Sequence, residues 1–231
     1  MSYDILLFDA DRTLFDFDKS EEIAFYEVAE QNGVNPTKEI FEVYKKINLK
    51  NWEDLEKGLV TKNRLVVRRF EQLYEYLGIK NGNAVKFDDD YLHALSKQSI
   101  LYDYSMQLVD NLKKANKRIF LITNGVTKVQ EGRIKGSPIE PYFEQVFISE
   151  QMGVAKPQKL FFDLVAQKIK NYNHSRAIVI GDSLTSDIQG ANNANLPCVW
   201  LNWDNANPPP SLNITFEAKS LKQVETFLLN N

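Results

Sequence analysis

Cysteine and histidine are scarce in this chain of 231 residues, and their scarcity excludes two classes of protein. The one cysteine, Cys198, rules out an internal disulfide framework and is typical of a protein from a reducing compartment. The two histidines, His93 and His174, lie far apart in the sequence with no cysteine near them, so we expect no zinc site. The sequence therefore favours neither a disulfide-stabilised scaffold nor a zinc protein.

Long apolar stretches and a strong charge excess are also lacking. No apolar run approaches the ~20 residues that span a bilayer, and the N-terminus shows no basic segment followed by a long apolar one, so we expect neither a membrane partner nor a signal peptide. A net charge of −3 and a pI near 5.6 provide no electrostatic attraction to nucleic-acid polymers or anionic membranes. With 43% hydrophobic and 26% charged residues, we expect a cytoplasmic globular protein, either a monomer or a weak homodimer.

Residues 20–98 show no β-type alternation of apolar and polar positions. Apolar residues recur there at helical spacing, and we expect helices over 20–31, 37–48, 61–77 and 88–98. Gly33 and Gly78 follow the first and third of these stretches, as glycine often does at helix ends. The block therefore predicts an all-helical, four-helix insertion.

From residue 104 onward, strands and helices are expected to alternate. Short apolar runs predict strands over 118–122, 145–148, 177–180 and 198–201, in addition to 5–8 near the N-terminus. Such alternation implies parallel βαβ units. The predicted fold class is α/β, with a Rossmann-like parallel sheet core formed by residues 1–16 and 103–231 and an inserted helical domain formed by residues 17–102.

Two carboxylates, Asp9 and Asp11, come directly after the first predicted strand. In open α/β sheets the ligand lies just beyond the carboxyl ends of the strands, so both side chains should reach the same crevice. Placing two like charges so close is costly unless a cation or phosphate chemistry uses them. The alternative is an ordinary acidic turn between strand and loop. The residues at the ends of the other strands distinguish a ligand-binding pair from such a turn.

The next strands also end on polar residues. Thr123 and Asn124 follow the strand predicted at 118–122, and a Thr hydroxyl and exposed backbone N–H groups bind phosphate oxygens well. Lys156 stands before Pro157, which is expected in the first helical turn and would hold the lysine toward the crevice. Taken singly, these residues also fit a chain-breaking turn and a solvated surface lysine.

A second pair of carboxylates occurs in the run GDSLTSD. Asp182 follows the strand predicted at 177–180, and Asp187 stands one turn further on. One of them alone would fit a helix cap. Together with Asp9 and Asp11 they form a carboxylate cluster, and ligation by oxygen atoms alone suits Mg²⁺, which also bridges to substrate phosphate.

Four motifs, DADRT, ITNG, GVAKP and GDSLTSD, occur in this order with a helical insert after the first. This arrangement resembles the haloacid dehalogenase (HAD) superfamily of aspartyl phosphatases. The stretches NLKNW, RRFE and GVAKPQKLFF look like the pyrimidine 5′-nucleotidase branch, whose members also hydrolyse noncanonical nucleotides. The resemblance implies a Mg²⁺-dependent phosphomonoester hydrolase whose small-molecule substrate is a pyrimidine nucleoside monophosphate.

The resemblance also implies a role for each motif residue. Asp9 would be the nucleophile that forms an aspartyl-phosphate, and Asp11 would be the general acid and then the general base. Thr123 and the N–H groups near Asn124 would hold the phosphoryl oxygens, while Lys156 would neutralise charge on nucleophile and phosphate. The implied Mg²⁺ ligands are Asp9, the backbone carbonyl of Asp11, Asp182 and Asp187.

By the same resemblance, the helical block is a cap that covers the crevice and excludes water. Asn48, Trp52 and Arg69 are candidates for binding the base, although Trp52 fits ordinary cap packing equally well. Position 12 is commonly glycine or acidic in this family and is Arg12 here. We expect Arg12 to point to solvent, with attraction of an anionic substrate as the alternative.

The sequence fits other functions less well than this one. A phosphorylation-dependent receiver domain would lack the helical insert, and a dehalogenase would not require the acid that Asp11 supplies. A hydrolytically idle phospho-ligand-binding protein would not need every catalytic position to be occupied. A sugar-phosphate or broad-specificity small-metabolite phosphatase remains open, because the motif residues contact only the phosphoryl group and the metal.

Overall fold

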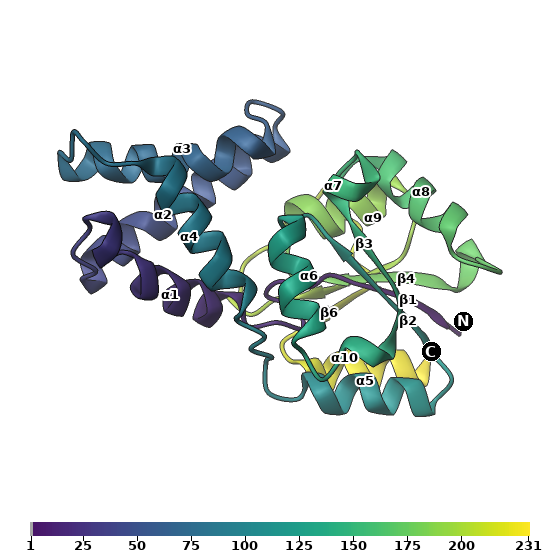
Figure 1. Cartoon of the computed structure of the whole chain (residues 1–231). Helices are drawn as coiled ribbons and strands as arrows, with labels where there is room; N and C mark the ends of the chain where they lie inside the picture. The colour runs from purple at the N-terminus through teal and green to yellow at the C-terminus, as the bar shows by residue number, and fades with distance from the viewer. Residues whose placement is uncertain (1) are drawn as a thin grey trace.

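The computed structural model describes residues 2–231, and its core is a six-stranded sheet in the order β3-β2-β1-β4-β5-β6 (Figure 1). All strand pairs are parallel. The strands are β1 (Ile5–Phe8), β2 (Arg118–Thr123), β3 (Phe143–Ile148), β4 (Ala177–Gly181), β5 (Cys198–Leu201) and β6 (Phe216–Ala218). This confirms the expected α/β class and places β1, with the first motif at its end, between β2 and β4.

The sheet is buried on both faces because alternate residues of each strand enter two different apolar clusters. Leu6 and Phe8 of β1 pack on one face, which α5 (Ser105–Lys114) and α10 (Leu221–Asn230) cover. Ile5 and Leu7 pack on the other face, beneath α8 (Lys159–Lys168) and α9 (Gln189–Asn193). The result is a three-layer core, with these helix pairs above and below the sheet in Figure 1.

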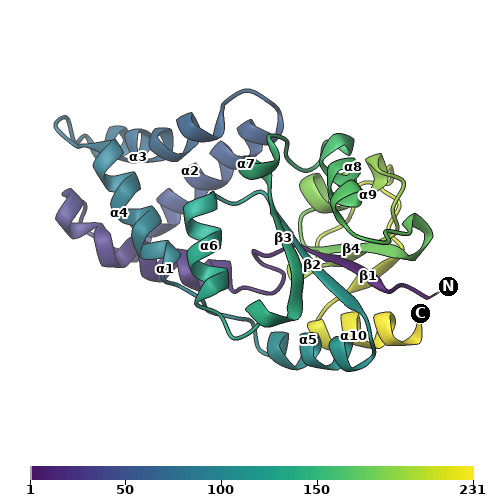
Figure 2. The same ribbon diagram turned by 45° about the vertical axis from the view of Figure 1, so that its right-hand side comes forward.

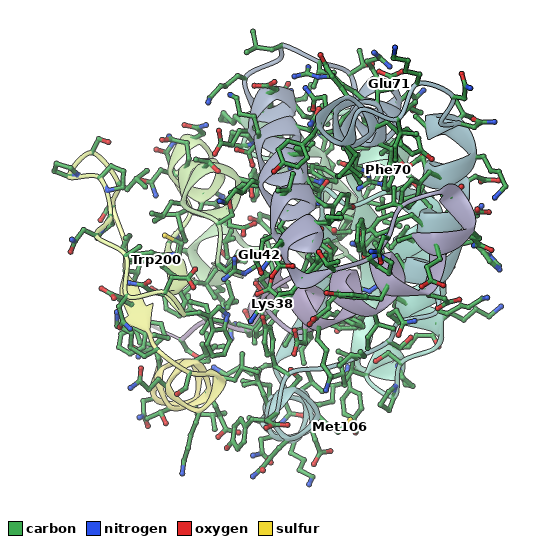
Figure 3. The ribbon with its side chains drawn as sticks, turned by 90° about the vertical axis from the view of Figure 1, so that its left-hand side faces the viewer. Lys38, Glu42, Phe70, Glu71, Met106 and Trp200 are labelled. Carbon is green, nitrogen blue, oxygen red and sulfur yellow. The ribbon has the colours of Figure 1, made fainter. Side chains whose placement is uncertain are left out.

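The inserted domain consists of α1 (Phe17–Val28), α2 (Lys38–Glu56), α3 (Lys62–Leu77) and α4 (Ala84–Ser96), which lie together beside the sheet in Figure 2. Stacked aromatic rings form its centre: the ring centroids of Phe70 and Phe87 are 4.1 Å apart, and those of Phe25 and Tyr44 are 4.7 Å apart. Figure 3 shows Phe70 among these helices and its neighbour Glu71 at their margin. Among residues 2–231, no helix combines the length and hydropathy needed to cross a bilayer.

Several boundaries differ from those expected. Strand β6 was not predicted, since it has only three residues and pairs only with β5. Helix α4 begins at Ala84, four residues before the expected start, because the Asn83 side chain accepts a hydrogen bond from the Lys86 N–H and caps it. Helix α8 begins only at Lys159, so the expectation that Pro157 lies in its first turn is wrong.

Two linkers join the helical domain to the core and run beside each other. The Asp16 N–H donates to the carbonyl of Ile100 (3.0 Å), and the Tyr102 N–H donates to the carbonyl of Leu14 (3.1 Å). Helix α6 (Thr127–Lys135) packs against the C-terminal part of α4 next to these linkers. We propose residues 17–102 as the cap domain, with these paired linkers as its hinge.

Candidate active site

The parallel sheet brings three of the motif residues together at its carboxyl edge. Asp9 follows β1, Thr123 ends β2 and Asp182 follows β4. Phe8 is in register with Leu121 on one side and with Ile180 on the other, and the Asp9 N–H donates to the Ile180 carbonyl at 2.8 Å. The side chains that follow these strands therefore project from adjacent positions of one edge.

Lys156 is buried and donates to three oxygen atoms. Its Nζ lies 2.6 Å from Asp9 Oδ1, 2.7 Å from Asp187 Oδ1 and 3.0 Å from the carbonyl of Ile122. These contacts use all three donors of the ammonium group. The solvated alternative for Lys156 is thus wrong, and the lysine joins the first, second and fourth motifs.

The charges around Lys156 are unbalanced. Carboxylate oxygens of Asp9, Asp182 and Asp187 lie within 4.8 Å of one another, and one lysine faces them. Burial raises the pKa of Asp9 to about 7, with Asp187 and Asp11 adding to the rise and Lys156 opposing it. Burial, Asp9 and Asp187 likewise raise the pKa of Asp182. Two buried carboxylates and one half-buried carboxylate, with surplus negative charge, fit a hard divalent cation such as Mg²⁺.

A tight turn after β4 positions the Asp187 side chain. Residues Leu184–Ile188 form a π-helical turn whose Asp187 side chain accepts from the Ser183 N–H at 3.2 Å. A Cβ at Gly181 would lie 2.3 Å from Asp187 Oδ2, so only glycine leaves room for this carboxylate. The glycine of the GDSLTSD run therefore serves the carboxylate cluster directly.

Asp11 lies apart from the three clustered carboxylates. Its Oδ2 accepts from Gln130 Nε2 at 2.5 Å, and its Oδ1 pairs with Arg133 Nη1. Neither partner was predicted from the sequence, although their spacing of three residues places both on one face of α6. The metal contact implied for the Asp11 backbone carbonyl stays a prediction.

The loop after β2 is held by reciprocal bonds. Asn124 Nδ2 donates to the carbonyl of Lys156 (2.8 Å), and the Lys156 N–H donates to Asn124 Oδ1 (3.0 Å). Thr123 Oγ1 accepts from the Gly125 N–H at 3.0 Å, which leaves its hydroxyl proton for donation to a ligand. Asn124 therefore uses its side chain to join two motifs, and the phosphoryl contact implied for the N–H groups near it stays a prediction.

A lysine of the cap reaches this loop across the domain boundary. Lys62, at the start of α3, donates to the carbonyl of Asn124 (2.6 Å) and to Ser149 Oγ (2.9 Å) of α7 (Ser149–Met152), where the α2–α3 connection approaches the core in Figure 2. Burial lowers the pKa of Lys62 to about 8, with Lys156 adding to the fall and Glu150 opposing it. No pattern in the sequence marked Lys62, because only tertiary packing brings the first turn of α3 to the core.

The expectation that Arg12 points to solvent is wrong. Its Nη2 pairs with Asp204 at 2.9 Å, and its Nε lies 3.6 Å from both Asp182 and Asp18. Its φ of +57° lies in the left-handed region that favours glycine, which, like an acidic residue, is common at this position in the family that the sequence resembles. Arg12 thus balances acidic groups at the rim of the site.

The three cap candidates occupy different environments. Trp52 lines the cavity at the carboxyl edge of the sheet, as does Arg69. The Asn48 side chain is instead buried inside the cap, with its Nδ2 donating to Glu21 at 2.7 Å. Arg69 is itself held by Asp88 (2.8 Å) and by Asn48 Oδ1 (3.2 Å). The structure thus places Asn48 inside the cap, in contact with Glu21 and Arg69, and not among the side chains that line the cavity.

The cavity has a volume of about 450 Å³ and two chemically different ends. The core end presents the polar motif residues Asp9, Asp11, Thr123, Asn124, Lys156, Asp182 and Asp187. The cap end presents mainly apolar side chains: Phe17, Trp52, Leu55, Leu92 and Leu95. Glu56, whose pKa burial raises, and Arg69 are the charged side chains that α2 and α3 bring to it.

The comparisons with known proteins agree with this geometry. A family model described as haloacid dehalogenase-like hydrolase matches residues 3–195. The chain is 37% identical to the pyrimidine 5′-nucleotidase PynA of Streptococcus pneumoniae, covering 87% of this chain and 85% of that protein. It is 32% identical to the pyrimidine 5′-nucleotidase YjjG of Escherichia coli, covering 99% of both chains. The crystal structure of the HAD-hydrolase YfnB from Bacillus subtilis, bound to magnesium, superposes with a TM-score of 0.93 at 31% identity over 99% of each chain.

Proposed function

The chain belongs to the haloacid dehalogenase-like hydrolases and is a phosphohydrolase of that family, and we propose that it hydrolyses pyrimidine nucleoside 5′-monophosphates, noncanonical ones included. The proposal rests on the lining of the cavity. The clustered carboxylates and Lys156 lie at its core end, and apolar side chains, including Trp52, lie at its cap end. The relatives PynA and YjjG, both pyrimidine 5′-nucleotidases, support the same substrate class.

The core end is suited to phosphoryl transfer by two carboxylates with different tasks. Asp9 attacks phosphorus, the bond to the leaving oxygen breaks, and Asp11 supplies the proton that this oxygen needs. Water then attacks the aspartyl-phosphate, Asp11 takes up its proton, and inorganic phosphate leaves with Asp9 regenerated. The Thr123 hydroxyl and the backbone that follows it hold the phosphoryl oxygens, while Lys156 compensates charge on Asp9.

The fit of the buried carboxylates to a divalent cation supports a Mg²⁺ site held by Asp9, Asp182 and Asp187, with the Asp11 carbonyl as a further ligand. The magnesium in the YfnB crystal structure supports the same choice of metal. When bound, Mg²⁺ would neutralise charge on the transferring phosphoryl group.

The cap end is suited to a planar, largely apolar leaving group. Trp52 offers an aromatic face next to the leucines of α2 and α4. An array of sugar hydroxyl groups would lose its hydration against such a wall and find few partners there. A nucleobase can stack on an aromatic ring, an interaction worth about 1–3 kcal/mol per base.

The test is a kinetic panel in which the phosphoryl group is constant and the leaving group varies. Deoxyuridine, uridine and thymidine 5′-monophosphates are compared with purine nucleotides, ribose 5-phosphate and p-nitrophenyl phosphate, each with Mg²⁺ and with EDTA. We expect kcat/KM for the pyrimidine nucleotides to exceed that for ribose 5-phosphate by about 5- to 150-fold, the range that base stacking supplies. EDTA should abolish turnover of every ester.

Two outcomes contradict the proposal in different ways. Equal kcat/KM for ribose 5-phosphate and the nucleotides would identify a sugar-phosphate or broad-specificity phosphatase. Binding of phosphate esters without turnover of any of them would identify a ligand-binding protein that has lost hydrolysis. The variant Asp9→Asn serves as the control in each assay, because it removes the nucleophile and keeps the size of the side chain.

A further inference from the structure

Helix α6 approaches the cap hinge more closely than side chains would permit. A Cβ at Gly132 would lie 2.6 Å from the carbonyl oxygen of Ser96, and a Cβ at Gly136 would lie 2.7 Å from Ser99 Oγ. Gly132 lies in α6 and Gly136 caps its C-terminal end, four residues later, so both lie on the side of the helix that meets the end of α4 and the linker after it. The core therefore contacts the hinge through a glycine face.

Arg133 lies next to this glycine face and contacts both linkers. Its Nε donates to the carbonyl of Gln98 (3.0 Å) in the returning linker, and Ser99 Oγ donates to its carbonyl (2.7 Å). On the outgoing side, its guanidinium lies 5.0 Å from the ring centroid of Phe15 and 5.7 Å from that of Phe17. One side chain of the core thus touches both chain segments that join residues 17–102 to the core.

The same guanidinium reaches Asp11. Arg133 Nη1 pairs with Asp11 Oδ1, while Gln130, one turn earlier on α6, donates to the other carboxylate oxygen at 2.5 Å. Gln130 fits there because position 125 is glycine: a Cβ at Gly125 would lie 2.1 Å from Gln130 Nε2. Each oxygen of Asp11 is thereby held from the α6 side, and each keeps a second lone pair that can face the cavity.

Stability alone does not explain a buried arginine here. The Arg133 side chain has no exposed surface, and its Nη2 has no hydrogen-bond partner among residues 2–231. A buried ion pair is often replaced by apolar residues without loss of stability, and an unpaired buried N–H group is unfavourable. The placement of Arg133 is therefore better explained by its contacts with Asp11 and with the linker carbonyl of Gln98.

We propose that Arg133, assisted by Gln130, is a positioning residue that sets the side-chain orientation of Asp11 and ties it to the hinge at Gln98 and Ser99. Movement of the cap then displaces the guanidinium and the acid together. The proton of the leaving oxygen is supplied only when the cap is placed over the substrate. This inference rests on the proposed function, in which Asp11 protonates the leaving oxygen.

The test uses two aryl esters of similar shape, phenyl phosphate and p-nitrophenyl phosphate, so that it does not depend on the nucleotide assignment. Phenolate needs a proton as it leaves, whereas p-nitrophenolate hardly does. The readout is kcat/KM, which reports on the steps up to departure of the leaving group and not on hydrolysis of the aspartyl-phosphate, a step that both esters share. In Arg133→Met we expect kcat/KM for phenyl phosphate to fall about 10- to 100-fold, the scale of a misplaced catalytic group, and kcat/KM for p-nitrophenyl phosphate to fall less than about threefold. Arg176→Met is the matched control, since Arg176 pairs with Asp4 at the opposite end of the sheet.

A double-mutant cycle separates positioning from general damage. In an Asp11→Asn background, Arg133→Met should change kcat/KM for phenyl phosphate by no more than about twofold, because the group that Arg133 holds no longer donates a proton. Equal losses on the two esters, or losses that multiply with those of Asp11→Asn, would overturn the proposal. If Arg133→Met does not fold, Gln130→Leu is used in the same cycle, with the same two outcomes deciding. A nucleotide panel that fails while this cycle succeeds would reject only the substrate assignment.

Discussion

Glu21 offers a test of the cap interior that does not depend on catalysis. It lies on α1, is 5% exposed, and accepts a hydrogen bond from Asn48 Nδ2 at 2.7 Å. Burial raises the pKa of Glu21 from 4.5 to about 7, while the bond from Asn48 and the charge of Arg69 oppose the rise. The folded protein therefore holds a proton on this side chain at pH values where the unfolded chain has released it.

This difference in bound protons makes the free energy of unfolding depend on pH. Between pH 4.5 and about 7 the folded state binds more protons at Glu21 than the unfolded state, so the free energy of unfolding falls as pH rises and levels off above pH 7. At about 1.4 kcal/mol per pH unit, this interval corresponds to about 3 kcal/mol of lost stability. Glu21→Gln keeps the neutral shape and the acceptor for Asn48 but removes the ionisation.

The assay is urea unfolding of wild type and Glu21→Gln at pH 4.5 and pH 8. We expect the two proteins to differ by less than about 1 kcal/mol at pH 4.5, and Glu21→Gln to be more stable by up to about 3 kcal/mol at pH 8. Glu22→Gln, on the exposed face of the same helix, is the control and should shift stability by less than about 0.5 kcal/mol at either pH. A stability difference that is the same at both pH values, or a less stable Glu21→Gln at pH 8, would refute the reasoning.

Three further outcomes follow from the site. Asp9→Asn should fold and lose at least about 100-fold in kcat on every ester, because the amide is a poor nucleophile; activity near wild type in steady-state assays would remove Asp9 from its role. Trp52→Ala should lower kcat/KM for pyrimidine nucleotides about 5- to 150-fold and spare p-nitrophenyl phosphate, whereas a parallel loss on both would make Trp52 part of the cap packing only. Asn48→Ala should lower stability by about 1–3 kcal/mol in thermal unfolding, since Glu21 loses the hydrogen bond from Asn48 and Arg69 loses one of its acceptors, and should lower kcat/KM on nucleotide and aryl esters alike. A loss confined to nucleotides would show instead that Asn48 contacts the base.

Much of the fold was predictable because burial in this chain follows local periodicity. The apolar runs of β1, β2, β4 and β5 are buried on both faces, as a parallel sheet between two helix layers requires. Asp9, Thr123 and Asp182 were found because each follows such a run, and parallel strands place their carboxyl ends at one edge. Strand β6 escaped prediction because three residues at the sheet edge produce no periodic pattern.

The contacts of each side chain at the site depend on packing between segments that are distant in the sequence. Asp11 could be placed near the crevice from its position after β1, but its partners Gln130 and Arg133 stand more than a hundred residues away and meet it only because α6 docks on the hinge. Lys62 and Arg12 likewise meet partners that no local pattern indicates. Local sequence determined which residues are buried and where strands end, because those properties depend on neighbouring residues. The tertiary structure alone decided which polar groups pair, because each pairing requires two separately folded segments to approach within hydrogen-bond distance.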